Sequence, residues 1–270
     1  MTQPEVISTA GLKLVAFAPE GLGVLVPAAP STAETLFREH PEVILAADGP
    51  MFSLCPGEPP DPQYTRYRCG IVDYGLIDVA RGVSVRSRYT GKGVTLSLVG
   101  GRLVGSRGWS PAAGASVAVQ GYPGLVEAGR VAVGEHPTGD NAVPNGRVAV
   151  GVLTDGRAFM AYARTDMRTF AERLAGAGAQ WAAYTDGGGS SSLVLRRPTG
   201  ELVGSDSDDP RGRRVPSWIV WAPAATSRQT VGPTGTRLVL PGASASTAVP
   251  WVLAAGVVFA AGAYWVRGRR

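Results

Sequence analysis

Glycine and proline interrupt this chain too often for long regular elements to form. The 270 residues include 37 glycines and 21 prolines, and only 17% of residues are charged. This composition argues against a helical bundle, a coiled coil and a charged disordered tail. Because 44% of residues are hydrophobic, the chain can still bury a substantial core. The apolar residues must therefore lie in short elements joined by tight turns.

Most of the apolar runs have the length of strands and are separated by turn signals. Residues 94–104 predict a hairpin that turns at Gly100 and Gly101, and residues 148–154 and 158–163 predict two strands joined by a short turn. Further strands are predicted over residues 13–26, 43–47, 117–126, 181–184, 192–195, 201–203 and 217–221.

Two segments have helical spacing. Residues 32–39 follow a Pro-Ser-Thr start, and residues 167–177 place Phe170 and Leu174 on one face after a capping Asp166. Since strands outnumber helices, we expect the α+β class, a sheet-dominated mixed domain with a few helices.

Composition divides the chain into three parts. Residues 1–222 form the predicted domain, residues 223–248 are a linker rich in Pro, Gly, Ser and Thr, and residues 249–270 hold an apolar run with a basic tail. The run is uncharged, has aromatic residues near both ends and is followed by RGRR. This pattern predicts a single C-terminal transmembrane helix through residues 249–266, with a buried terminal helix as the alternative.

The expected membrane anchor leaves the sidedness of the domain open. A basic tail favours a cytoplasmic C-terminus, yet the first residues lack the pattern of a secretory signal. We expect a membrane-anchored protein, at a cell surface or on a virion. Cys55 and Cys69 would form a loop disulfide outside the cytoplasm and stay free thiols inside it.

The net charge of +5 does not indicate a nucleic-acid partner. Three of the 26 basic residues follow position 249 and no acid does, which leaves 23 bases against 21 acids in the rest of the chain. Only Lys13 and Lys92 are lysines, and no Arg-rich helix or aromatic RNA-binding pattern is present. A nucleic-acid binder is therefore disfavoured.

The residues Trp181 to Leu195, WAAYTDGGGSSSLVL, form the most informative stretch of the chain. Three consecutive glycines are costly in backbone entropy, so a tight turn alone explains them poorly. A backbone without Cβ atoms lets a ligand approach and leaves N–H groups to bind an anion. Asp186 would face this cradle. The alternative is a glycine-rich hairpin bulge beside a solvated Asp186.

This stretch and several other elements, in the same order, resemble the phosphodiester glycosidase family over about residues 40–222. The resemblance includes a strand that ends in a glycine turn near Phe52, a Gly-x-Pro-x-Leu-Val element, an arginine strand start, Asp-Gly-Gly-Gly-Ser-Ser, and an Arg-x-Val-Pro segment. In that order, the strand and glycine turn are residues 43–52, the Gly-x-Pro-x-Leu-Val element is 121–126, and the arginine strand start is 146–157. The Asp-Gly-Gly-Gly-Ser-Ser motif is residues 186–191, and the Arg-x-Val-Pro segment is 213–216.

The chain departs from the family pattern at several positions. Asp48 stands where the family has Asn, Pro50 replaces a glycine, and Gly146 and Val148 flank Arg147 in place of Pro and Thr. A carboxylate accepts hydrogen bonds but does not donate them as an amide does. Asp48 therefore indicates an altered substrate choice or a site that binds without turnover.

The resemblance implies hydrolysis of a sugar-1-phosphodiester in a glycan, a cell-wall polymer or a glycolipid. We expect Asp186 to act as nucleophile or general base, Asp48 as second carboxylate or sugar ligand, and Arg147 as phosphate clamp. The expected substrate contacts are the N–H groups of Gly187, Gly188 and Gly189, the hydroxyls of Ser190 and Ser191, and Arg214.

The sequence requires no cofactor for this reaction. Asp206, Asp208 and Asp209 form an acidic cluster that is either a solvated loop or a calcium site. The expected partners are a phosphorylated glycan or polymer and the membrane. The alternative function is a non-catalytic glycan-binding or structural protein of a cell surface or virion that keeps the glycosidase fold.

Overall fold

The computed structural model describes residues 3–9, 11–54, 70–134, 139–188, 191–204 and 214–223. The chain divides into two units, and all of these residues belong to the unit that spans residues 1–230. Within the described ranges, no helix is long and apolar enough to cross a membrane. Apart from Pro223, the predicted linker lies outside these ranges, as do the apolar run, the two cysteines and the acidic cluster.

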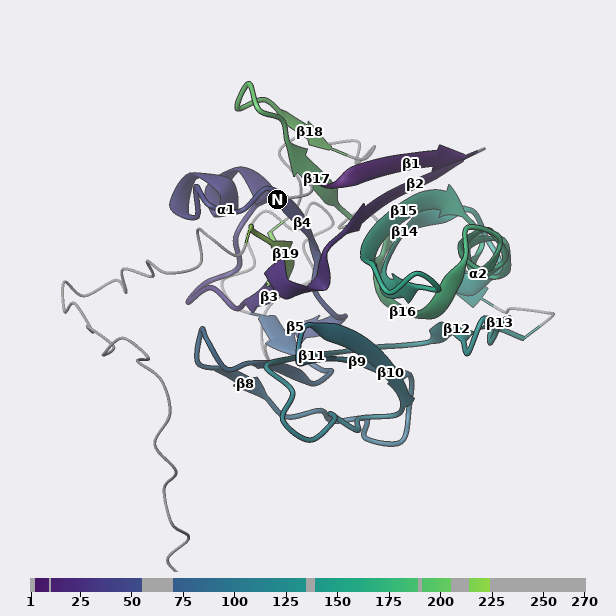
Figure 1. The fold of residues 1–270 in the computed structure, drawn as a ribbon. Coiled ribbons are helices and arrows are strands. Elements are labelled where there is room, and N and C mark those ends of the chain that lie inside the picture. The colour runs from purple at the N-terminus through teal and green to yellow at the C-terminus, as the bar shows by residue number, and fades with distance from the viewer. Residues whose placement is uncertain are drawn as a thin grey trace, which may run out of the picture. The chain divides into compact units, whose positions relative to one another are not determined.

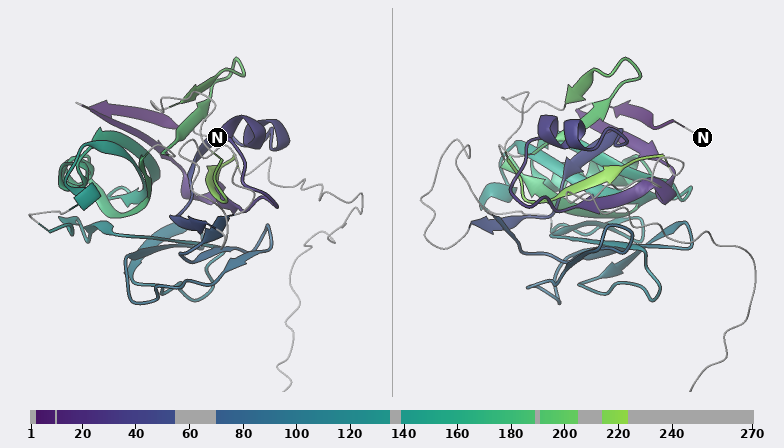
Figure 2. Two further views of the ribbon diagram at one scale, coloured as in Figure 1. Left: turned by 180° about the vertical axis from the view of Figure 1, so that it is seen from behind. Right: turned by 90° about the vertical axis from the view of Figure 1, so that its left-hand side faces the viewer.

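Antiparallel sheets dominate the domain, as the α+β prediction requires (Figures 1 and 2). The seven-stranded sheet has the order β1 (Glu5–Thr9), β2 (Leu12–Phe17), β15 (Ala158–Thr165), β14 (Asn145–Leu153), β16 (Ala179–Gly187), β12 (Gly124–Glu127) and β13 (Arg130–Val131). One five-stranded sheet has the order β10 (Arg102–Arg107), β9 (Val94–Val99), β11 (Val117–Gly121), β7 (Leu76–Asp78) and β8 (Val83–Val85).

The second five-stranded sheet carries the C-terminal strand of the described domain. Its order is β18 (Leu202–Gly204), β17 (Leu193–Arg196), β4 (Leu45–Asp48), β19 (Trp218–Trp221) and β3 (Leu22–Leu25). A further pair joins β5 (Phe52–Leu54) and β6 (Gly70–Val72). The α-helices are α1 (Ala33–Glu39) and α2 (Met167–Gly176), and short 3-10 turns span Pro19–Gly21 and Gly139–Asn141.

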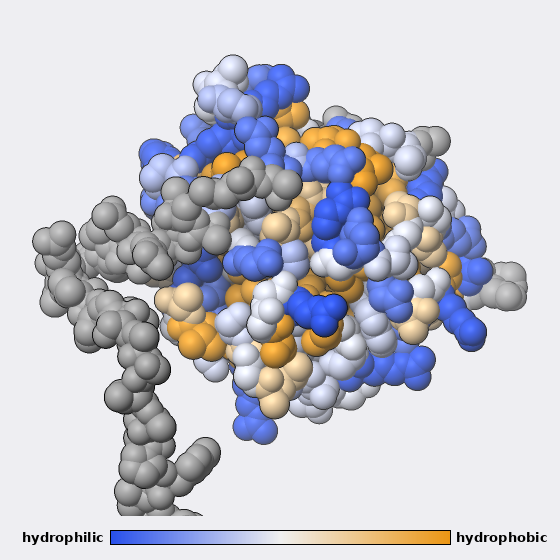
Figure 3. Space-filling model, in the orientation of Figure 1, coloured by the Kyte–Doolittle hydropathy of each residue, from blue (hydrophilic) through white to orange (hydrophobic). Residues whose placement is uncertain are grey.

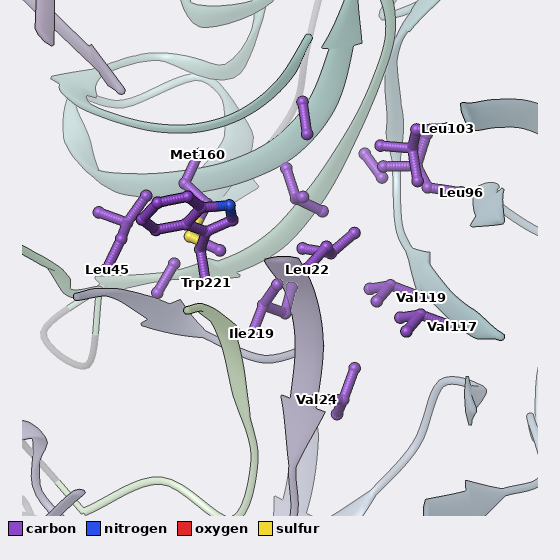
Figure 4. Packing of buried hydrophobic residues seen from close by; sticks show 14 of the residues in the cluster. Leu22, Val24, Leu45, Leu96, Leu103, Val117, Val119, Met160, Ile219 and Trp221 are labelled. Atoms are coloured by element: carbon purple, nitrogen blue, oxygen red, sulfur yellow. The ribbon is translucent and has the colours of Figure 1, made fainter. Parts of the chain in front are cut away.

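One apolar core lies between the three large sheets. Figure 4 shows Met160 of the seven-stranded sheet near Leu45 and Trp221 of one five-stranded sheet, with Leu96 of the other sheet beyond them. The alternation expected of strands supplies these residues: Val148, Val150 and Val152 of β14 and every second residue of β15 and β19 belong to this core.

The opposite faces of two sheets are covered by the helices. Phe170 and Leu174 of α2 pack against the seven-stranded sheet, and Leu36 and Phe37 of α1 pack with Trp218 and its neighbours on the other. Thus β14, β15 and β19 are buried on both faces. Only their ends and the loops beyond them can present polar groups without breaking apolar packing.

The sequence predicts several of these elements closely. The hairpin of β9 and β10 turns at Gly100 and Gly101, which have φ of 54° and 78°. The second helix begins after Asp166, whose side chain accepts a hydrogen bond from the Thr169 N–H at 2.8 Å. The Thr32 side chain caps α1 in the same way, at 3.2 Å from the Thr35 nitrogen.

The structure divides two stretches that the sequence predicts as strands. The 3-10 turn at Pro19–Gly21 separates β2 from β3, and Tyr122–Pro123 separates β11 from β12. In each case the two parts pair in different sheets. Proline lacks the N–H that a continuing ladder would need, so the chain leaves one sheet and enters another.

On the face of the molecule shown in Figure 3, hydrophobic residues lie in small groups between hydrophilic ones. The large hydrophobic side chains that are exposed in the described ranges are Val6, Val26, Val79, Tyr89, Val104, Tyr122, Val143 and Leu202. Scattered aliphatic side chains of this kind are normal for a protein surface. The two exposed tyrosines differ, because both pack against Tyr74 in one aromatic cluster.

Replacing Phe170 by Ala tests the packing of α2 on the seven-stranded sheet. Because Phe170 is fully buried, we expect the variant to lose about 3–5 kcal/mol of unfolding free energy. Urea unfolding measures this loss. The control Val104→Ala changes an exposed side chain and should stay within about 0.5 kcal/mol of the original protein. Equal effects of the two substitutions would contradict the burial described for α2.

Candidate active site

Asp48 ends β4 and is fully buried. Its Oδ2 accepts a hydrogen bond from the Ser192 N–H at 2.9 Å, and its own N–H donates to the Ser192 carbonyl at 3.2 Å. Its other oxygen, Oδ1, has no hydrogen-bond partner among the described residues. Two strands of one sheet therefore fix this carboxyl group by one oxygen and leave the second available.

Asp186 lies near the end of β16, opposite Val148 of β14. The register shifts immediately before it, because Ala149 pairs with Tyr184 and Thr185 is the extra residue of a β-bulge. The Thr185 hydroxyl donates to the Val148 carbonyl at 3.4 Å. A bulge redirects the side chains that follow it, so this irregularity sets the direction of the Asp186 carboxylate. That carboxylate accepts from the Gly187 N–H at 2.7 Å.

The structure brings Asp48 and Asp186 together, although 137 positions separate them in the sequence. Burial raises the pKa of Asp48 well above its usual range, and the negative charge of Asp186 raises it further. The hydrogen bond from Ser192 lowers this pKa but does not compensate. Both effects favour the neutral form of the Asp48 carboxyl group.

A protonated Asp48 resembles the asparagine that it replaces. A neutral carboxyl group has one O–H donor besides its acceptor oxygens. With Oδ2 occupied by Ser192, the proton can reside on Oδ1 and point toward a ligand. The difference between Asp48 and an asparagine therefore depends on protonation: the ionised carboxylate only accepts hydrogen bonds, whereas the neutral form also donates one.

Arg147 extends into the site from β14, but most of its N–H donors are hydrogen-bonded to other groups of the protein. Its Nε donates to the Thr165 carbonyl at 2.9 Å, its Nη2 to the carbonyls of Asp140 and Val143, and its Nη1 to the Tyr184 hydroxyl at 3.4 Å. The guanidinium group is almost completely buried. Four of its five N–H groups thus hold the chain together, which leaves little capacity for a phosphate.

Tyr184 connects Arg147 with Asp186. Burial raises the pKa of Tyr184, the charge of Asp186 raises it further, and Arg147 partly opposes both effects. Its hydroxyl lies only 1.6 Å from the place where a Cβ on Gly187 would be. Gly187 is therefore dictated by the packing of a phenol, and its N–H already binds the Asp186 carboxylate.

Serine hydroxyls complete the surroundings of the carboxyl pair. The oxygens Ser191 Oγ and Ser217 Oγ are buried and have no hydrogen-bond partner within the described part of the chain. Ser217 Oγ lies 2.1 Å from an ideal Cβ on Gly49, the residue after Asp48, so Gly49 makes room for it. Buried hydroxyls in proteins are normally bonded, and these two therefore indicate a position for ligand or solvent oxygen atoms.

Ser217 was missed by sequence reasoning. It follows the Arg-x-Val-Pro segment immediately before β19, and that segment predicts an anion contact at Arg214 instead. Arg214 is exposed and has no hydrogen bond or ion pair among the described residues. Proximity of Ser217 to Asp48 follows from the pairing of β19 with β4, which no local signal reveals.

Gly188 begins the turn that follows β16. Its φ is +83°, and its carbonyl accepts the Ser191 N–H at 3.3 Å. Gly189 and Ser190, the other members of the predicted cradle, lie outside the described residues. Within the described part of the chain, no three side chains of His, Cys, Asp or Glu converge as metal ligands.

Two surface hollows of about 650 Å³ and 420 Å³ lie away from this constellation. The larger is lined by residues 152–157 together with Trp181, at the opposite end of β14 from Arg147. The smaller is lined by Pro41, Ile44 and residues 195–198. The buried carboxyl pair and its orphaned hydroxyls, rather than the size of a hollow, identify the candidate site.

A comparison with protein families identifies the family of this chain. A model of the phosphodiester glycosidase family matches residues 65–221. The chain belongs to the phosphodiester glycosidase family. This match confirms the resemblance that the ordered sequence elements indicated, and it includes Arg147, Asp186 and the strands that hold them.

Solved structures with the same fold are distant in sequence. The catalytic domain of zebrafish N-acetylglucosamine-1-phosphodiester alpha-N-acetylglucosaminidase, auto-inhibited by its pro-peptide, is 17% identical with a TM-score of 0.56, covering 82% of this chain and 81% of that one. A putative exported protein from Burkholderia pseudomallei is 13% identical with a TM-score of 0.53, covering 78% and 74%. No curated protein sequence matches the chain. The family assignment therefore rests on the family model, and the structures show the shared fold.

The burial of Asp48 predicts an unusual pH dependence of stability. Above the pKa of an unfolded aspartate, about 3.9, the unfolded state loses its proton while folded Asp48 keeps it. Rising pH therefore destabilises the protein at this residue. Asp48→Asn removes the titration and retains an oxygen for the Ser192 N–H, so we expect it to melt on the order of a few degrees higher near pH 7.

Thermal unfolding across a pH series checks this expectation. The gain from Asp48→Asn should be small near pH 4 and should grow as the pH rises. The control Asp155→Asn alters an exposed acid whose pKa is lowered, chiefly by the Arg157 N–H, and should show no such gain. A pH-independent difference between Asp48→Asn and the original protein would contradict the assignment of the proton to Asp48.

Proposed function

We propose that this domain hydrolyses the bond between a sugar and a phosphodiester, in a glycan, a cell-wall polymer or a glycolipid. Membership of the phosphodiester glycosidase family supports the reaction class. The observation that carries the proposal is the buried pair Asp48 and Asp186, in which burial and the charge of Asp186 raise the pKa of Asp48. Enzymes separate the roles of two carboxyl groups by this kind of difference in environment.

The chemistry requires a negative group near the sugar and no strong acid near the phosphate. When the bond between the anomeric carbon and the phosphate oxygen breaks, its electron pair leaves with the oxygen, and the sugar becomes oxocarbenium-like. Water supplies a hydroxyl group to the anomeric carbon and a proton to the products. The products are a free sugar and a phosphomonoester, whose oxygen is only weakly basic.

We assign the negative charge to Asp186, which acts as nucleophile or as the base that activates water. The bulge at Thr185 and the Gly187 N–H orient its carboxylate. Neutral Asp48 donates a hydrogen bond from Oδ1 to a sugar hydroxyl or to the departing oxygen. This role reproduces the donor capacity of an amide, so the replacement of Asn by Asp48 is compatible with turnover.

The hydroxyls of Ser191 and Ser217 are proposed substrate contacts, because they are buried beside the pair and lack partners within the described ranges. Gly188, Gly189 and Ser190 stay candidates for contacts to the phosphate. For Arg147 we propose a positioning role, because it holds the Tyr184 hydroxyl and the loop before β14.

We also propose that residues 249–266 attach the domain to a membrane. An uncharged run flanked by aromatic residues and followed by arginines supports this proposal. A tethered domain would act on substrates at the same surface, such as a phosphorylated glycan, a wall polymer or a glycolipid head.

Sugar release from a simple diester, such as N-acetylglucosamine 1-(methyl phosphate) and related sugar-1-phosphodiesters, tests the function. Asp186→Ala should lower kcat/KM by about a thousandfold or more, because it removes the charge that stabilises the transition state. Asp48→Ala should cause a similar loss, whereas Asp48→Asn should retain activity to within about tenfold, since an amide still donates one hydrogen bond. The matched control is the exposed acid variant Asp155→Asn.

The pH profile adds a second criterion. Activity of the original protein should decline at alkaline pH as Asp48 loses its proton, and Asp48→Asn should lack this decline. Activity that persists in Asp186→Ala would remove the assigned mechanism. Binding without hydrolysis across a panel of diesters would favour the non-catalytic glycan-binding alternative.

A further inference from the structure

Three tyrosines and a lysine from separate segments form a cluster on the surface of the domain. The rings of Tyr74 and Tyr122 are stacked, with centroids 6.2 Å apart and planes 10° apart, and the Tyr89 ring lies 5.2 Å from that of Tyr74. Lys92 Nζ lies 5.6 Å from the Tyr89 centroid and 5.7 Å from the Tyr122 centroid. Tyr74 is buried, while Tyr89 and Tyr122 are 41% and 38% exposed.

A fully buried glutamine holds this cluster in place. Gln120 Nε2 donates to the Tyr89 carbonyl at 2.9 Å and to the Lys92 carbonyl at 2.7 Å, and Gln120 Oε1 accepts the Gly75 N–H at 3.0 Å. These bonds hold the segments that contain Tyr74, Tyr89 and Lys92 against β11, and Tyr122 directly follows β11. The cluster is thus preorganised, and a ligand would not have to order it on binding.

The cluster presents one positive charge on an aromatic surface. No carboxylate pairs with Lys92 among the described residues, and Asp73, the acid nearest in sequence to Tyr74, pairs with Arg88 at 3.2 Å. Burial, together with the neighbouring phenols of Tyr89 and Tyr122 and the Asp73 carboxylate, raises the pKa of Tyr74 to about 12. An ammonium group binds phosphate as a point charge, and flat rings supply apolar contact for a sugar or another ring.

The cluster adjoins the strands that carry the candidate active site. The Pro123 carbonyl, next to Tyr122, accepts the Tyr184 N–H at 3.1 Å, and Tyr184 is two residues before Asp186. From strand spacing and rise, the backbones of Tyr122 and Asp186 lie within about 10 Å of each other. The Asp73 N–H donates to the Met51 carbonyl at 3.2 Å, three residues beyond Asp48. Backbone hydrogen bonds thus join segments next to the cluster to residues two or three positions away from each carboxyl group in the sequence.

We propose that Lys92, Tyr89 and Tyr122 form a subsite for the phosphorylated leaving group of the substrate. The proposal rests on the proposed hydrolysis of a sugar phosphodiester. That reaction needs a cation for the phosphate product, and the donors of Arg147 are largely occupied by backbone carbonyls. Lys92 supplies an available charge, and the tyrosine rings pack against the organic part of the leaving group.

Nuclear magnetic resonance can test this binding without any turnover. The chain has only two lysines, Lys13 and Lys92, so a sample labelled with ε-carbon-13 lysine gives two assignable side-chain signals. Glucose 6-phosphate should shift the Lys92 signal in a saturable manner and leave Lys13 unchanged. Inorganic phosphate should shift it more weakly, and glucose should not. If both lysine signals move alike, or if Lys92 does not respond, the subsite does not exist.

Kinetics distinguish failure of the subsite from failure of the proposed function. For a diester with a phosphorylated leaving group, Lys92→Met should raise KM and the inhibition constant of the phosphomonoester product about tenfold, with kcat changed little. Lys92→Arg should restore part of the affinity, and Lys13→Met is the matched control. Hydrolysis that is indifferent to Lys92→Met overturns the subsite alone. A Lys92 response to glucose 6-phosphate without hydrolysis of any diester overturns the proposed reaction and leaves the anion site.

Discussion

The sharing of one apolar core by three sheets is the constraint on which the rest of this structure depends. Met160, Leu45 and Leu96 belong to three different sheets and pack into the same interior. Each sheet needs the other two to bury its apolar face from water. Because β14 and β19 are buried on both faces as well, polar chemistry is confined to strand ends. Asp48 stands at such an end, Asp186 lies one residue from the end of β16, and Arg147 lies two residues from the start of β14.

Placing polar groups at the ends of buried strands opposes folding. Asp48 loses the solvation of its charge, and the hydroxyls of Ser191 and Ser217 are buried without partners in the described part of the chain. Apolar residues of similar size would pack there at lower free energy. The domain has these polar groups although they lower its stability. Such a loss of stability is characteristic of binding and catalytic sites.

Local signals in the sequence predicted what local physics determines. The glycine pair at 100 and 101 predicted the turn of a hairpin, and the cap at Asp166 predicted the first residue of a helix. The meeting of Asp48 with Asp186 was available only through the family resemblance, because it depends on pairings between distant strands. The raised pKa of Asp48, the occupied donors of Arg147 and the contact of Ser217 follow from burial and register, which no local pattern in the sequence indicates.

The packing of the Tyr184 hydroxyl against Gly187 changes how a run of three glycines should be interpreted in evolutionary terms. Gly187 is required because the Tyr184 side chain fills the space of a Cβ atom, and Gly188 is required because its backbone is left-handed, with φ of +83°. Adjacent glycines of one motif are thus under different selective pressures. A relative with a smaller residue at the position of Tyr184 could carry alanine after its aspartate without any change in chemistry. In such a relative, a residue other than glycine at the position of Gly187 would indicate a change in packing at position 184 and not a loss of activity.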